Sequence, residues 1–198
     1  AVDNFPLMAI PLFILAGEIM VKSEMMERLV SFSNSLIGKV HGGLAHVTIV
    51  SGMILAAVSG AAVACASALG SALVPALRKY YPDGYSSAVI ASAANLGPVI
   101  PPSNAMIVYA LMAGSTVSVG ALFVSGIIPG LILTIGFMSI ASFISWKRKY
   151  PLTGEAFSMA NALHQFRRAG VIIFMPILVV GGIIGGVFTA TEGAAIAV

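Results

Sequence analysis

The chain reads Asn95-Leu96-Gly97-Pro98-Val99-Ile100-Pro101-Pro102-Ser103 in the middle of an apolar run that extends from 85 to 112. A helix cannot pass through this stretch intact, because the three prolines lack backbone donors and clash with the preceding turn. In lipid, the carbonyls that such a break frees are costly unless they are buried in protein or line a cavity. The sequence therefore predicts a discontinuous helix over 85–112, whose inner ends bind an ion or a substrate.

The composition of the chain predicts that this break lies in a membrane. Hydrophobic residues make up 59% and charged residues 9%, whereas a soluble domain carries about 25% charged residues. The mean hydropathy is +1.02. The net charge of +3 does not argue for nucleic acid, because positive charge in a membrane protein more often marks its cytoplasmic loops. We predict an all-α, multi-pass membrane protein in contact with lipid and, since the chain does not begin with Met, a fragment of a longer one.

A run of small residues from 42 to 77 is interrupted near its middle by Ser59-Gly60-Ala61. Each half has about 17 residues, which is marginal for a full crossing. We therefore predict a re-entrant helix hairpin over 42–80 with its tip at 59–61. The charges agree, because a run that enters and returns on one side leaves all ten Lys and Arg residues on one face, which the positive-inside rule makes cytoplasmic. Two complete spans satisfy the charges as well, and only their length argues against them.

The two inner ends of the broken helix carry opposite partial charges. The first half of the broken helix ends near 95–97 with free carbonyls, which suit a cation, and the second half begins near Ser103 with free N–H groups, which suit an anion. No carboxylate falls inside either element, which argues against a divalent ion. We therefore expect Na⁺ among neutral oxygens, and a carboxylate-bearing substrate at the start of the second half. The candidate side-chain ligands of Na⁺ are Ser59, Ser67, Asn95 and Ser103. The candidate substrate-binding positions are Pro101, Pro102, Ser103 and Asn104.

Two other functional classes remain open at this point. An intramembrane serine protease would pair Ser59 with His46, but Ala57-Val58 stands where a serine elbow needs glycine. A purely structural membrane subunit would make both helix breaks silent to mutation. The single cysteine, Cys65, allows neither an internal disulfide nor a metal cluster, and no cofactor motif is present. We therefore expect a transporter rather than an enzyme, with Na⁺ as a coupling ion and no cofactor.

Four motifs resemble those of a known family: residues 11–18 (Pro-Leu-Phe-Ile-Leu-Ala-Gly-Glu), the Ser59-Gly60 tip, the break at 95–103, and residues 181–192, which end in Thr189-Ala-Thr-Glu192. In this order they resemble the large, DctM-like membrane subunit of tripartite ATP-independent periplasmic (TRAP) transporters. The resemblance implies a Na⁺-driven importer of organic acids, such as sialic acid or C4-dicarboxylates, in the bacterial inner membrane. It also implies two partners, a small membrane subunit and a periplasmic substrate-binding protein.

The same resemblance implies a site. In the family, the hairpin tip and the unwound helix would hold Na⁺ between them. The corresponding residues of this chain are Ser59, Gly60, Ala61, Asn95, Gly97, Pro98 and Ser103. The family often has Ser after the Gly of the tip, so that coordination at Ala61 must use its carbonyl. The chain resembles the first half of an inverted-repeat, elevator-type transporter. We divide it into a first membrane segment with an interfacial amphipathic helix (1–41), the hairpin and broken helix (42–112), a membrane span with a cytoplasmic amphipathic segment (113–168), and the start of the next repeat (169–198).

Overall fold

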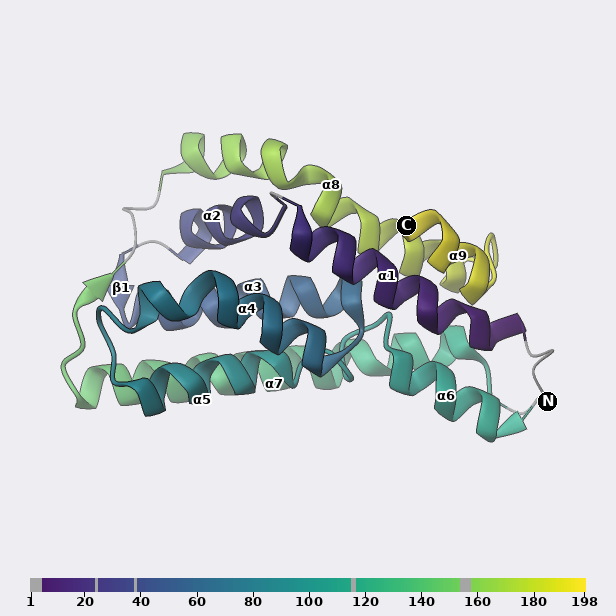
Figure 1. The fold of residues 1–198 in the computed structure, drawn as a ribbon, viewed down its shortest axis with the longest axis horizontal. Coiled ribbons are helices and arrows are strands. Elements are labelled where there is room, and N and C mark those ends of the chain that lie inside the picture. Colours follow the sequence, from purple (N-terminus) through teal and green to yellow (C-terminus); the bar gives the residue numbers. More distant parts are fainter. Residues whose placement is uncertain (1–4, 24, 38, 115–116, 154–157) are drawn as a thin grey trace.

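The computed structural model describes residues 5–23, 25–37, 39–114, 117–153 and 158–198. Within them, the two helices long and apolar enough to cross a membrane are α7 (Val119–Lys147) and α8 (Met159–Ile184). Only 17% and 22% of their most apolar windows are buried inside the protein. A core helix of a soluble protein would be mostly buried, so these exposed apolar faces suit contact with lipid. Figure 1 shows most helices running along the long axis of the molecule.

The chain begins with a 3₁₀ turn, η1 (Phe5–Met8), followed by α1 (Ala9–Lys22) and α2 (Met25–Ile37). The helix that we predicted within 23–38 is confirmed, and it buries Met26, Leu29 and Phe32. Its polar and apolar faces are less separate than predicted, because Leu36 is exposed and Ser35 is buried. The hydroxyl of Ser35 donates to the Phe32 carbonyl at 2.7 Å, which satisfies it inside the helix.

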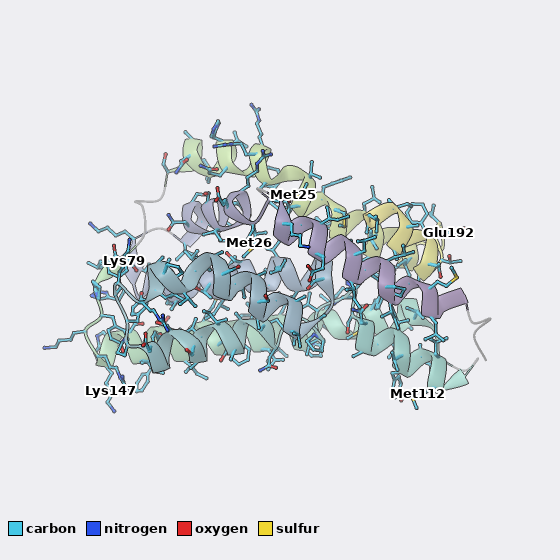
Figure 2. All side chains as sticks on the ribbon, viewed as in Figure 1. Met25, Met26, Lys79, Met112, Lys147 and Glu192 are labelled. Atoms are coloured by element: carbon cyan, nitrogen blue, oxygen red, sulfur yellow. The ribbon has the colours of Figure 1, made fainter. Side chains whose placement is uncertain are left out.

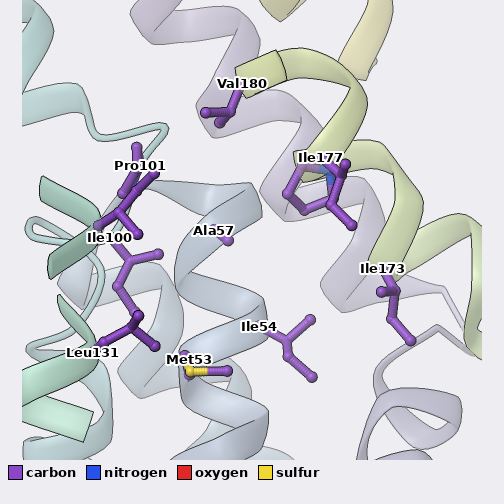
Figure 3. A pocket seen from close by; sticks show the side chains of 11 residues that line it. Met53, Ile54, Ala57, Ile100, Pro101, Leu131, Ile173, Ile177 and Val180 are labelled. Atoms are coloured by element: carbon purple, nitrogen blue, oxygen red, sulfur yellow. The ribbon is translucent and has the colours of Figure 1, made fainter. Parts of the chain in front are cut away.

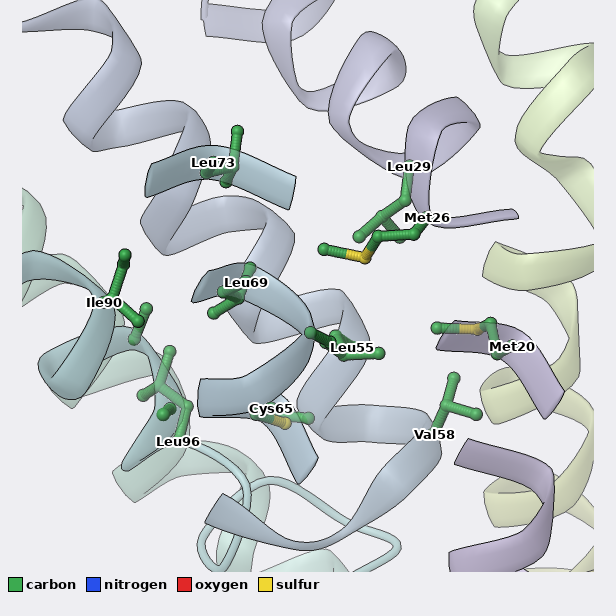
Figure 4. Close-up of a cluster of buried hydrophobic side chains, with 14 of the residues drawn as sticks. Met20, Met26, Leu29, Leu55, Val58, Cys65, Leu69, Leu73, Ile90 and Leu96 are labelled. Atoms are coloured by element: carbon green, nitrogen blue, oxygen red, sulfur yellow. The ribbon is translucent and has the colours of Figure 1, made fainter. Parts of the chain in front are cut away.

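A helix hairpin and a helix pair form the centre of the molecule. The core lies where their apolar faces meet, and Figure 4 shows Leu55, Leu69 and Ile90 converging there. The sharp turn at 60–61 and the loop at 95–103 lie at the same end of this core. The four helices are α3 (Gly43–Ser59), α4 (Ala62–Leu77), α5 (Asp83–Ala94) and α6 (Asn104–Met112).

A short clasp joins the base of the hairpin to the segment that follows α7. Strand β1 (Val40–His41) pairs antiparallel with β2 (Leu152–Thr153). The Thr153 hydroxyl accepts the Leu44 N–H at 3.0 Å and lies 3.2 Å from the Tyr81 hydroxyl. Gly42 has a φ of +71°, and a Cβ there would collide with the Ser145 hydroxyl. The clasp lies at the end of the molecule that carries Lys79 and Lys147, opposite Met112 and Glu192 (Figure 2).

Helix α8 differs from the sequence prediction. We expected an amphipathic segment over 155–168 and a separate span from 170, but one helix runs from Met159 to Ile184, so the boundary at 168/169 falls inside it. A lone glycine such as Gly170 costs only about 1 kcal/mol in a helix interior, which is too little to break it. Residues 154–157 lie outside the described residues.

The glycine-rich stretch at 181–186 ends α8, and one of its glycines is closely packed, because a Cβ at Gly182 would collide with the Phe188 ring. A Cβ at Gly181 would meet nothing within 4 Å, and Gly186 turns the chain with a φ of +71°. Helix α9 (Ala190–Ala197) follows. A capping box starts this helix, in which the Thr189 hydroxyl accepts from the Glu192 N–H and the Glu192 carboxylate accepts from the Thr189 N–H at 2.7 Å.

Candidate functional site

The hairpin tip is a two-residue turn. Helix α3 ends at Ser59, Gly60 takes a left-handed conformation (φ 60°, ψ 13°), and its N–H donates to the Ala56 carbonyl. Ala61 is extended and precedes α4 without a side-chain cap. Glycine is required at 60 because other residues pay a steric penalty in this conformation. The tip therefore presents main-chain groups rather than polar side chains.

The break between α5 and α6 is a series of turns. The Leu96 carbonyl accepts the N–H groups of Val99 and Ile100. Among the residues that the structure describes, no donor reaches the carbonyls of Gly97, Val99 or Pro101. Such carbonyls at the end of a helix carry partial negative charge. The break is thus a group of neutral oxygens with unused acceptor capacity.

The tip and the break touch each other. The Asn104 N–H donates to the Gly60 carbonyl at 3.3 Å, and the Asn104 side-chain amide donates to the Ser59 carbonyl at 3.4 Å. Gly97 lies so close that a Cβ on it would be 2.8 Å from the Ala61 carbonyl carbon. A Cβ on Gly60 would likewise be 2.5 Å from the Pro102 carbonyl oxygen. The structure therefore brings Gly60 and Ala61 together with the start of α6 at Asn104, which lies 44 residues after Gly60 in the sequence.

Ser103 caps α6 and ties it to the break. Its hydroxyl donates to the Pro98 carbonyl at 2.7 Å and accepts the Met106 N–H at 3.4 Å. The side chain is fully buried. These two bonds use the hydroxyl hydrogen and one lone pair, so the main role of Ser103 is structural. One lone pair of its hydroxyl oxygen is left for a ligand.

Asn104 has a free acceptor beside the tip. Its side-chain oxygen, Oδ1, is buried and has no hydrogen-bond partner. Such an atom costs about 1–3 kcal/mol if nothing binds it. We predicted that Asn104 binds the substrate, and its contact with the tip was not predicted. The sequence at the start of a helix indicates its capping residue, but it does not indicate which distant segment the helix faces.

The remaining predicted ligands are placed less favourably. Ser59 is buried, but its hydroxyl lies 3.1 Å from the Cys65 sulfur, and Gly17 of α1 packs on it, where a Cβ would be 2.8 Å from the Ser59 Cβ. The side chains of Asn95 and Ser67 are exposed, and no contact joins either of them to the tip within the described part of the chain. Of Asn95, only the main chain belongs to the break.

The two prolines that precede Ser103 face apolar surroundings. Pro101 and Pro102 are both buried, and Pro101 lines a cavity of about 320 Å³ beside the break. Figure 3 shows Met53, Leu131 and Ile173 around this cavity, together with Ile100 and Pro101 of the break. Its walls are Met53, Ile54 and Ala57 of α3, Ile100 and Pro101 of the break, Ile127 and Leu131 of α7, and Ile173, Pro176, Ile177 and Val180 of α8.

The serine protease alternative is not supported by the geometry. Ser59 and His46 lie at opposite ends of α3, thirteen residues or about 20 Å apart along a helix. His46 is bonded instead to the Gly42 carbonyl at 2.9 Å and to the Ser142 hydroxyl at 2.7 Å. Among the described residues, no three His, Cys, Asp or Glu side chains gather as a metal site would require.

Replacing Ser103 should destabilise the break. Ser103→Ala removes a helix cap and leaves the partly buried Pro98 carbonyl without its donor, at a cost of about 1–3 kcal/mol in the free energy of unfolding. Thermal denaturation of the purified full-length subunit should show a clearly lower midpoint. Ser67→Ala, an exposed serine in α4, is the matched control and should melt with the wild type. Equal midpoints for both variants would show that Ser103 does not hold the break together.

Comparison with known proteins gives one consistent result. The family model for the DctM component of tripartite ATP-independent periplasmic transporters matches residues 1–198. An uncharacterized protein, YgiK, of Salmonella typhimurium is 41% identical over 99% of this chain and 45% of its own length. The sialic acid TRAP transporter large permease protein SiaM of Vibrio cholerae is 36% identical over 98% of this chain and 45% of its own. The C4-dicarboxylate TRAP transporter large permease protein DctM of Pseudomonas aeruginosa gives the same figures. The chain spans about half the length of these curated relatives.

Proposed function

This chain belongs to the DctM family of TRAP transporter large permeases, and we propose that it forms part of the path by which Na⁺ and an organic acid cross the bacterial inner membrane together. The permeases of this family are transporters rather than enzymes. The named relatives carry sialic acid and C4-dicarboxylates. A carboxylate is the group that these acids share, and it is the group we assign to this chain's substrate.

The contact between the tip and the break carries the proposal for Na⁺. The Gly97 main chain packs against the Ala61 main chain. Among the described residues, no donor reaches the Gly97 carbonyl, and the buried Oδ1 of Asn104 has no hydrogen-bond partner. Neutral oxygens at the negative end of α5 suit a monovalent cation. We place Na⁺ at this contact, held mainly by main-chain carbonyls. The contributing residues are Ser59, Gly60, Ala61, Asn95, Gly97, Pro98 and Ser103, together with the side chain of Asn104.

The start of α6 is our proposed position for the substrate carboxylate. The positive end of the helix favours an anion there, beside Pro101, Pro102, Ser103 and Asn104. The N–H groups of Asn104 and Met106 already have acceptors, so the unoccupied Ala105 N–H is the donor left to it. A single donor binds a carboxylate weakly, and we therefore assign most substrate contacts to parts of the transporter outside this chain.

Reconstituted transport tests the proposal. The complete transporter would be placed in proteoliposomes with its small membrane subunit and its periplasmic binding protein, and uptake measured for sialic acid and for C4-dicarboxylates. Replacing external Na⁺ by choline should abolish uptake of the acid that is transported. Undiminished uptake in choline would refute coupling to Na⁺. The proposed elevator motion and re-entrant hairpin are separate predictions, which cysteine crosslinking between α3 and α8 in two transport states would examine.

A further inference from the structure

A polar groove of about 230 Å³ lies between α2 and the first half of α8, outside the tip and the break. The same two helices also contact each other through Phe32 and Phe166, whose ring centroids are 6.0 Å apart. The walls of the groove consist of Glu27, Arg28 and Ser31 from α2 and Gln165 and Arg168 from α8.

The chemistry of the groove suits an anion with several acceptor oxygens. Arg168 offers a planar fork of N–H donors, which matches phosphate oxygens two at a time, and Arg28 adds a second positive charge to the groove. Gln165 and Ser31 add neutral donors. Glu27 is the one acidic group among the five, so the groove carries a net charge of +1 from two arginines and one glutamate. A phosphate bound here would meet attraction from both arginines and repulsion from Glu27.

The surface of α8 next to the groove distinguishes a lipid from a free phosphate. Beyond Arg168 the exposed face becomes apolar at once, with Val171 at 71%, Phe174 at 62% and Ile177 at 62% exposure. Val171 lies one turn from Arg168, and Phe174 lies one turn from Val171, so these two side chains form an apolar strip that begins beside the guanidinium. A headgroup site that continues into an apolar strip has the form of a phospholipid.

The position of the groove along α8 agrees with a headgroup at the membrane surface. Residues 147–149 at the end of α7 and the arginines at 167 and 168 are the basic groups of the connected segments. The positive-inside rule assigns this side to the cytoplasm, where basic pockets between helices attract anionic lipid headgroups. We propose that the groove between α2 and α8 binds the phosphate of an anionic phospholipid of the cytoplasmic leaflet, with an acyl chain along Val171 and Phe174.

Lipid retention by the complete transporter is the test. The complex would be purified in neutral detergent containing equal amounts of phosphatidylglycerol and phosphatidylcholine, and the retained lipids counted by native mass spectrometry. The wild type should retain phosphatidylglycerol in preference. Because each charge near a membrane surface changes affinity about fivefold, Arg168→Gln should weaken the preference by that factor. Arg28→Gln with Arg168→Gln should nearly abolish it, and Glu27→Gln should strengthen it.

Controls separate this site from general surface charge. Lys79→Gln with Lys147→Gln removes two positive charges from another part of the exposed surface and should leave the preference unchanged. An equal loss in this control, no loss in the double arginine variant, or no gain in Glu27→Gln would overturn the proposal. Complete displacement of the lipid by inorganic phosphate would overturn the proposal that the ligand is a phospholipid and would show that the groove binds a free anion.

The test does not depend on transport. If the double arginine variant does not fold, Arg168→Gln and Glu27→Gln alone decide, because they must change retention in opposite directions. Lipid counting and Na⁺-dependent uptake are separate measurements, so failure here leaves the proposed transport function standing.

Discussion

Gly97→Ala is expected to lower Na⁺-dependent uptake about tenfold or more in the reconstituted transporter. The new Cβ would be 2.8 Å from the Ala61 carbonyl carbon and 3.0 Å from the Ala62 nitrogen. Both are main-chain atoms and cannot rotate away, so the tip must move from the break. Overpacking of this kind costs about 1–3 kcal/mol, and about 1.4 kcal/mol is a factor of ten in an equilibrium.

Gly70→Ala is the matched control for this prediction. It makes the same change in α4 of the same hairpin, where a Cβ would meet nothing within 4 Å, and alanine favours the helix by about 1 kcal/mol. Its uptake and Na⁺ dependence should equal those of the wild type. Wild-type uptake by Gly97→Ala as well would support a structural subunit whose helix breaks serve no transport path.

The helix breaks were predictable from sequence because their causes are local. Three prolines between 98 and 102 forbid a continuous helix whatever surrounds them, and α5 and α6 indeed stop at Ala94 and restart at Asn104. The same is true of the capping box at Thr189, where four residues contain both partners. Features of this kind depend only on neighbouring residues, so they can be predicted without knowledge of the tertiary structure.

The orientation of polar side chains was not predictable in the same way. Asn95 and Ser67 carry suitable oxygens, but the helices that hold them turn these side chains outward. Asn104 faces the tip because α6 approaches it end-on, which is a property of packing. The continuity of α8 was missed for a related reason: Gly170 weakens a helix only slightly, and the packing of α2 against α8 through Phe32 and Phe166 outweighs it.

Asn104 provides the second large effect. Asn104→Ala removes the donor to the Ser59 carbonyl and the buried oxygen beside the tip. An unpaired buried carbonyl costs about 1–3 kcal/mol, so the Na⁺ concentration for half-maximal uptake should rise about tenfold. Asn95→Ala, which removes an exposed amide at the other end of the break, is the control and should behave as the wild type.

Asn104→Asp then separates the two roles of this side chain, since it keeps an oxygen but loses the amide donor. If the free oxygen binds Na⁺, as we propose, the aspartate variant should be activated at a lower Na⁺ concentration than the alanine variant, because a carboxylate attracts a cation more strongly than an amide. Equal impairment of both variants would mean that Asn104 only fastens the tip. A severe defect in Asn95→Ala with a silent Asn104→Ala would reverse the assignment and return the ligand role to Asn95.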